Sequence, residues 1–99
     1  MFIVTVSFKL KNTENLKNKF IETAAIYKNT KGLIRKNYII NKETNVAGGV
    51  YLFDNSENAY NWFDQERIDF LSKRYSNPTI NYFECPIEVN NESKQINIF

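Results

Sequence analysis

The chain is 99 residues long and carries thirteen Lys and Arg against eleven Asp and Glu, a net charge of +2. This length predicts one small domain over residues 1–99, and the charge is spread along the chain without a basic cluster, so we expect no nucleic-acid partner. The absence of histidine removes the commonest general base and the commonest metal ligand, so we also expect no metal site.

The first thirty residues predict a strand followed by a helix. Apolar and mixed positions alternate from Phe2 to Leu10, which is typical of a strand with one fully apolar face. Asn12 or Thr13 can cap the next helix, whose apolar residues recur at helical spacing up to Tyr27. Gly32 is expected to end the helical region in the left-handed conformation.

The middle of the chain predicts two strands joined by a hairpin turn. Leu33–Asn41 and Val46–Phe53 are rich in β-branched and aromatic residues, and a short polar turn over residues 42–44 separates them. Gly48 and Gly49 lie inside the second of these strands, where glycine marks a bulge or a close approach to the backbone. We favour a role in sheet curvature for both glycines.

The second half predicts a second helix and a last strand. Asp54 can cap a helix, with Glu57 completing a capping box, and the helix is expected over residues 56–74. A polar stretch over residues 64–67 interrupts the apolar pattern and is expected to bend this helix. Asn77-Pro78 signals a turn, and a fourth strand is expected over residues 79–85.

The order of these elements is β-α-β-β-α-β. It predicts an α+β, ferredoxin-like fold, with an antiparallel sheet and two helices on one face. The strands carry apolar residues on both faces, as Ile3 and Val4 do, so one apolar face stays uncovered. A second copy of the chain is the simplest cover, which predicts a homodimer. The tail over residues 87–99 mixes apolar residues among polar ones and is expected to pack on the partner subunit.

Aromatic residues are abundant, and cysteine is nearly absent. Eight Phe, six Tyr and one Trp give more ring surface than a small core needs, which favours a self-association surface or a ligand cavity. The apolar runs are too short to span a membrane, and Met1 leads into a strand rather than a signal peptide. The single Cys85 suits a reducing compartment, so we expect a cytoplasmic protein without a membrane partner.

Three short motifs resemble the YdhR-type monooxygenase family. They are Gly32-Leu33 before the second strand, A-G-G-V-Y-L-F over residues 47–53 followed by an acidic helix start, and Val89-Asn90 with Gln95-Ile96-Asn97 near the end. The resemblance covers Gly32 to Asn97 by motif and the first thirty residues by pattern. It implies a dimeric α+β barrel, the superfamily that includes antibiotic-biosynthesis monooxygenases and IsdG-type haem-degrading enzymes.

The resemblance also implies a monooxygenase that uses no cofactor. Quinone-forming relatives oxidise electron-rich phenols with molecular oxygen, so the protein supplies an apolar slot and polar groups that favour the phenolate. The catalytic candidates are Arg35, Asn37, Tyr51 and Trp62, and the substrate-binding candidates are Ser7, Phe63 and Arg67. Arg35 is expected to stabilise the phenolate by its charge, and Tyr51 or Asn37 to orient its oxygen.

These assignments have alternatives. Trp62 also fits a role as core filler, and Arg35 and Arg67 also fit a solvated face. The whole protein also fits a non-catalytic dimer that holds a small apolar or aromatic molecule. Haem degradation is disfavoured, because the haem-degrading relatives place a ligating histidine where this chain has Ser72 and Lys73.

Overall fold

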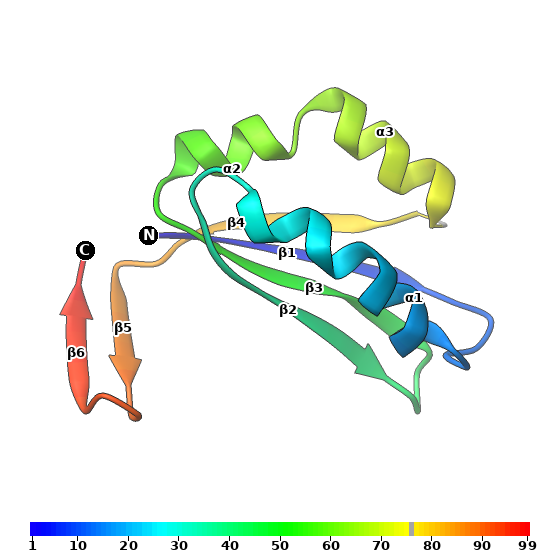
Figure 1. Ribbon diagram of the computed structural model, residues 1–99, viewed down its shortest axis with the longest axis horizontal. Helices are drawn as coiled ribbons and strands as arrows, with labels where there is room; N and C mark the ends of the chain where they lie inside the picture. The colour runs from blue at the N-terminus through cyan, green and yellow to red at the C-terminus, as the bar shows by residue number, and fades with distance from the viewer. Residues whose placement is uncertain (76) are drawn as a thin grey trace.

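The computed structural model describes residues 1–75 and 77–99 (Figure 1). One antiparallel sheet has the strand order β2-β3-β1-β4, with β1 at Phe2–Lys9, β2 at Leu33–Asn41, β3 at Val46–Phe53 and β4 at Thr79–Glu84. The helices are α1 at Leu16–Ala24, continued by the 3-10 helix η1 at Ala25–Asn29, then α2 at Ser56–Trp62 and α3 at Gln65–Arg74. The predicted ferredoxin-like α+β order is confirmed, and a hairpin of β5 (Ile87–Asn90) and β6 (Gln95–Ile98) follows it.

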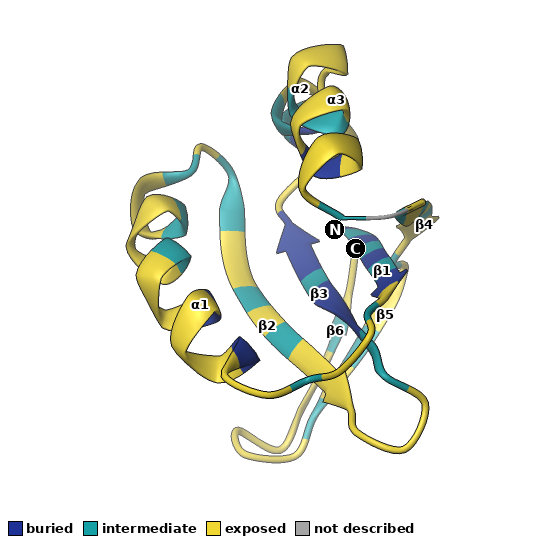
Figure 2. Cartoon of the chain, turned by 90° about the vertical axis from the view of Figure 1, so that its right-hand side faces the viewer, coloured by how far each residue is buried: buried dark blue, intermediate teal, exposed yellow. Residues whose placement is uncertain are grey.

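The helices cover one face of the sheet, and the core lies between the two layers (Figures 1 and 2). β1 alternates as predicted, with Val4 and Val6 buried towards the helices and Ile3 half-buried on the other side. Val4 pairs with Tyr51 of β3, so the odd-numbered residues of β3 face the helices too. Burial of this apolar face is the main force that holds the helices to the sheet. In the described ranges, no helix is long and apolar enough to cross a membrane.

The start of α1 differs from the predicted cap. Asn15 precedes the helix in the left-handed conformation and makes no side-chain capping bond. The Asn12 side chain instead accepts a hydrogen bond from the Glu14 N–H at 3.1 Å, which forms a local turn before the helix. The prediction that Asn12 or Thr13 caps this helix was therefore wrong, because the chain turns once more before it begins.

The second helical region begins at Ser56, as predicted, but its capping residue is one position later than predicted and the helix is broken in the middle. Asn55 caps α2, and its side chain accepts from the Asn58 N–H at 2.8 Å. Asp54 was the wrong cap, because its carboxylate accepts from the Asn58 side chain instead. The predicted bend is confirmed as a full break: Asp64 caps a separate helix, α3, by accepting from the Arg67 N–H at 2.9 Å.

The glycines serve close packing. Pairing is continuous through Gly48 and Gly49, so neither forms a bulge. A Cβ at Gly48 would overlap the backbone carbonyl of Val6, and one at Gly49 would lie 3.0 Å from the Cε of Lys36. Close approach is therefore what these two positions provide. Gly32 has the predicted left-handed conformation, with φ of +77°.

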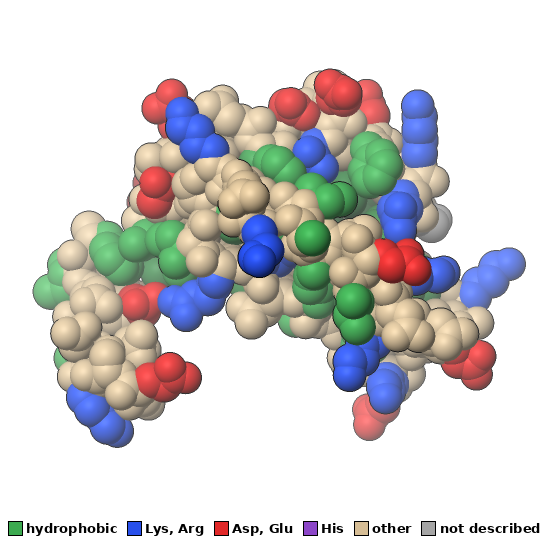
Figure 3. All heavy atoms as spheres, in the orientation of Figure 1, with side chains coloured by type: hydrophobic (Ala, Val, Ile, Leu, Met, Phe, Trp, Pro, Cys, Tyr) green, Lys and Arg blue, Asp and Glu red, His purple; other side chains and the backbone are tan. Residues whose placement is uncertain are grey.

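The face of the sheet opposite the helices keeps exposed apolar side chains, such as Phe83, 52% exposed, and Ile39, 41% exposed. The β5–β6 hairpin stands away from the helices (Figure 1). An Arg35–Glu88 ion pair at 3.2 Å links it to this sheet. Apolar side chains gather where the hairpin meets the domain (Figure 3). The exposed ones in this tail are Ile87, Val89, Ile96, Ile98 and Phe99.

Candidate functional site

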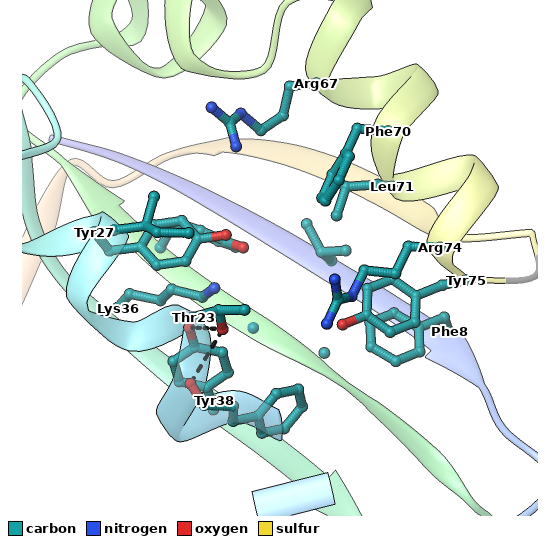
Figure 4. Close-up of a pocket in the computed structure, with 16 residues that line it drawn as sticks. Phe8, Thr23, Tyr27, Lys36, Tyr38, Arg67, Phe70, Leu71, Arg74 and Tyr75 are labelled. Carbon is teal, nitrogen blue, oxygen red and sulfur yellow. Dashed lines mark hydrogen bonds between the residues drawn. The ribbon is translucent and has the colours of Figure 1, made fainter. Parts of the chain in front are cut away.

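A cavity of about 150 Å³ lies between the helices and the sheet (Figure 4). Its walls are mainly aromatic and consist of Phe8, Phe20, Tyr27, Tyr38, Tyr51, Phe70 and Tyr75. Three cations, Lys36, Arg67 and Arg74, line the same space. Rings with a few charged groups converging between them suit a flat ligand that has a polar edge.

Lys36 extends from β2 into a cage of three tyrosine rings. Its Nζ lies 3.5 Å from the ring centroid of Tyr27, 3.9 Å from that of Tyr38 and 4.6 Å from that of Tyr51. The rings come from η1, β2 and β3, so three separate elements hold the amine in place (Figure 4). The ring faces attract an ammonium group, but they also displace the water that would solvate it.

A β-bulge in β2 directs Lys36 into this cage. Leu33 and Arg35 pair with adjacent residues of β3, so Ile34 is an extra residue in the strand. Regular alternation from Leu33, which packs on the core, would point Arg35 towards the helices. Because of the extra residue, Lys36 points there instead and pairs with Tyr51. Bulges commonly redirect a side chain in this way next to functional sites.

Burial is the main influence on ionisation in the cavity. It lowers the pKa of Lys36 from 10.5 to about 7, and the positive charge of Arg67 adds to the lowering. It raises the pKa of Tyr51 well above its ordinary value, with neighbouring tyrosines adding to the rise. It also raises the pKa of Tyr38, although the Thr23 hydroxyl, 3.0 Å away, opposes this. Near neutral pH, Lys36 is therefore present as both amine and ammonium, while the two tyrosines stay neutral.

Arg67 lies on the helix side of the cavity and stacks on Trp62. Its guanidinium carbon is 3.7 Å from the indole centroid, and the indole meets the Tyr27 ring edge-on with 5.5 Å between centroids. Within the described residues, Arg67 Nε and Trp62 Nε1 are buried without a hydrogen-bond partner. A buried donor left unpaired costs about 1–3 kcal/mol, so an acceptor on a ligand would be favoured beside Arg67.

Four of the predicted site residues lie at or next to this cavity. Tyr51 and Arg67 line it. Trp62 lies one layer behind, against Arg67 and Tyr27. Phe63 is buried and meets Tyr51 edge-on, with 4.9 Å between ring centroids. Trp62 and Phe63 therefore support the walls rather than form them.

The other three predicted residues lie on the opposite face of the sheet. Ser7 alternates away from the helices on β1, and Arg35 and Asn37 do so on β2. Arg35 and Asn37 line a separate hollow of about 210 Å³ there, where Glu88 of the hairpin accepts from Arg35. The predicted set is thus divided between the two sides of the sheet.

Lys36, Tyr27 and Tyr38 belong to the site but were not among its predicted residues. Lys36 and Tyr38, two residues apart on one strand, share a face, and that spacing was a usable signal for the cage. Tyr27 lies on η1 and is brought to the cage by tertiary packing, which the sequence pattern does not reveal. In the described part of the chain, no group of three or more His, Cys, Asp or Glu is placed to hold a metal ion.

Comparison with known proteins identifies a family and solved structures of similar fold. A family model described as "Putative mono-oxygenase ydhR" matches residues 2–97. A crystal structure described as a "putative antibiotic biosynthesis monooxygenase" from Deinococcus radiodurans has a TM-score of 0.68 at 13% identity, covering 91% of this chain and 97% of that one. A point mutant of MhuD, crystallised with two manganese protoporphyrin IX bound per active site, has a TM-score of 0.67 at 13% identity, covering 91% and 98%. Among curated proteins, none matches the chain.

Proposed function

The chain belongs to the ydhR mono-oxygenase family, and on that premise we propose that it oxygenates a small aromatic substrate within a homodimer and needs no cofactor. The observation that carries the proposal is Lys36, an amine with a pKa of about 7 that faces an aromatic-walled cavity. An amine with this pKa can take the proton of a phenol near neutral pH. The resulting ammonium then favours the phenolate.

The tyrosines have a complementary role. Tyr38 and Tyr51 stay neutral because burial raises the pKa of each. Neutral hydroxyl groups donate hydrogen bonds to a developing negative charge on the substrate oxygen, and their rings form flat walls for its ring. The cavity therefore offers a base, a cation and hydrogen-bond donors around one aromatic ligand.

The reaction balances without an external reductant. For 1,4-dihydroxybenzene, Lys36 takes a phenolic proton, and the phenolate passes one electron to O₂. The substrate radical and superoxide then join through a new ring C–O bond. The O–O bond breaks, the distal oxygen leaves as water with two of the substrate's hydrogens, and a hydroxyquinone remains. The substrate supplies all four electrons that reduce O₂, so no flavin, haem or metal is required.

The size of the cavity favours a single-ring substrate. An engineered protein cavity of about 150 Å³ accommodates benzene, whereas pockets for drug-sized ligands are about 300–1,000 Å³. The cavity here has about the former volume. Two residues of its lining, Ile26 and Phe70, are more than half exposed, so larger polycyclic phenols would project past these side chains into solvent.

A homodimer is supported by the apolar surfaces that the monomer leaves open. Phe83 and Ile39 are exposed on the sheet face opposite the helices, and Ile98 of the hairpin is 80% exposed. A two-stranded hairpin is marginally stable without further packing, so β5–β6 needs another surface beside it. A partner subunit packed on this face would cover both.

The proposal is tested by oxygen consumption with 1,4-dihydroxybenzene, corrected for a blank without protein. We expect uptake above the blank, with ¹⁸O₂ placing one labelled oxygen in the hydroxyquinone and one in water. Lys36→Met should abolish the protein-dependent uptake. Lys42→Met, which removes an exposed lysine of the β2–β3 turn, should leave it unchanged. Uptake equal to the blank across several phenols would contradict oxygenation and leave a protein that only binds its ligand.

A further inference from the structure

The charges around the cavity are all of one sign. Lys36, Arg67 and Arg74 line it, and none of the described lining residues is Asp or Glu. The ion pair present in the described structure, Arg35–Glu88, lies on the other face of the sheet. Charges held away from water are normally paired, so the protein alone leaves this cavity without its counter-charge.

Arg67 is the cation best placed to receive an anion from a ligand. It is half-buried, whereas Arg74 is exposed at the far end of the same helix face. The Trp62 ring, 3.7 Å from the guanidinium carbon, fixes the plane of the group. Its Nε is buried and has no acceptor among the described residues. A planar guanidinium with free donors matches the geometry of a carboxylate.

The two ends of the cavity differ in what they offer. Arg67 lies on the α3 side of the cavity, and Lys36 and Tyr38 lie on the sheet side, with Tyr27 between them (Figure 4). A single ring lying in the cavity therefore has a guanidinium towards one edge and the amine with its tyrosines towards another. This arrangement distinguishes two polar substituents on one ring.

We propose that the substrate is a phenolic carboxylate, with its carboxylate on Arg67 and its reacting hydroxyl at Lys36. The inference names the substrate class of the proposed oxygenation and so rests on that function. Neutral dihydroxybenzenes would use the same slot but leave Arg67 Nε without an acceptor. A ring of the 2,5-dihydroxybenzoate type has both substituents and fits the one-ring volume of the cavity.

Binding is measured first with a pair of ligands that do not consume oxygen. The pair is 3-hydroxybenzoate and 3-hydroxybenzamide, which have nearly the same shape but differ in charge. We expect calorimetry at pH 7 to show the carboxylate binding at least about tenfold more tightly, as hydrogen bonds to charged groups do. Arg67→Gln should remove this preference, so that the acid and the amide bind within about twofold of each other.

Two further variants separate charge from geometry. Lys73→Gln removes an exposed cation from the same helix outside the cavity, and it should keep the full carboxylate preference. Arg67→Lys keeps the charge without the planar fork and should retain only part of the preference. Circular dichroism serves as the control that each variant is folded. Equal binding of acid and amide to the wild type, or a preference that survives Arg67→Gln, would overturn the inference.

Oxygen uptake with 2,5-dihydroxybenzoate and 2,5-dihydroxybenzamide separates this inference from the proposed function. Equal uptake with both would support oxygenation and overturn the carboxylate site. No uptake with either, together with a carboxylate preference lost in Arg67→Gln, would contradict oxygenation and keep the site as a binding site for aromatic carboxylates. Faster uptake with the acid at low concentration is the result that supports both.

Discussion

Replacing Lys36 by methionine is expected to stabilise the fold at neutral pH while it removes oxygenation. The pKa of Lys36 falls from 10.5 to about 7 on folding. At 1.36 kcal/mol per pH unit this corresponds to about 5 kcal/mol. The side chain is half-buried, so solvent screening reduces the figure to roughly 2–3 kcal/mol. Methionine has a similar length and no charge, and it avoids this cost.

Contacts with the tyrosine rings change the size of this gain in stability. The three tyrosine rings attract the ammonium, and such contacts stabilise it by about 0.5–2 kcal/mol. Methionine sulfur also packs well against aromatic rings and recovers part of that. Burial and the charge of Arg67 are the causes of the lowered pKa, and the attraction of the rings offsets part of their effect. We therefore expect Lys36→Met to raise the free energy of unfolding by about 2 kcal/mol at pH 7.

The sign of the pH dependence is specific. Because the folded-state pKa is depressed, the unfolded chain binds more protons between about pH 7 and 10.5. Wild-type stability therefore rises relative to the variant as pH increases through this window, and the gain from Lys36→Met shrinks to well under 1 kcal/mol at pH 10. Other lysines and tyrosines titrate in both proteins, so their effects cancel in the difference.

Urea unfolding at pH 7 and pH 10 measures this difference. The single Trp62 reports unfolding by fluorescence, with circular dichroism as a second probe. Lys42→Met is the matched control, because that lysine is exposed and should give no change at either pH. A Lys36→Met variant less stable than the wild type at pH 7, or a gain that is the same at both pH values, would refute the reasoning.

Three further predictions concern Trp62, the tail and haem. Trp62→Phe should change unfolding free energy by under about 1 kcal/mol because the indole N–H has no described partner, whereas Trp62→Ala should cost about 3 kcal/mol in urea unfolding. Light scattering at micromolar concentration should give twice the 11.7 kDa chain mass, and a folded monomer would count against the dimer. Truncation after Pro86 should weaken dimerisation, and an unchanged dimer dissociation constant would count against a role of the tail in the interface. Adding haem should not shift its Soret band, because the chain has no histidine to ligate the iron. A shifted band that disappears when ascorbate is added would contradict this prediction.

The sheet and its buried face followed from the sequence because alternation is a direct signal of a half-buried strand. β1, β2 and β3 lie within a residue of their predicted bounds, and the polar stretch after Phe63, which predicted a bend, separates two helices. The caps of α1 and α2 were missed because several neighbouring Asn and Asp residues compete for one hydrogen bond. Which of them wins depends on the turn before the helix. The tail was predicted without its hairpin.

Only part of the site was predicted, and one physical reason explains the rest. Tyr51 and Arg67 reach the cavity, whereas Arg35 and Asn37 were predicted and Lys36 was not. Regular alternation from Leu33 would put Arg35 and Asn37 on the helix side of the sheet. One extra residue at Ile34 reverses the face of everything after it. A bulge leaves no mark in the alternation of a strand that is apolar on both faces.

The pH dependence of oxygen uptake tests the central claim, that Lys36 is the base of an oxygenase, most directly. Rates with 1,4-dihydroxybenzene are measured from pH 5.5 to 9 and corrected at each pH for a blank without protein. We predict that kcat/KM falls as pH drops through about 7, because the amine becomes an ammonium ion, and that Lys36→Met has no protein-dependent rate at any pH. A flat profile, or one retained in Lys36→Met, would contradict the claim.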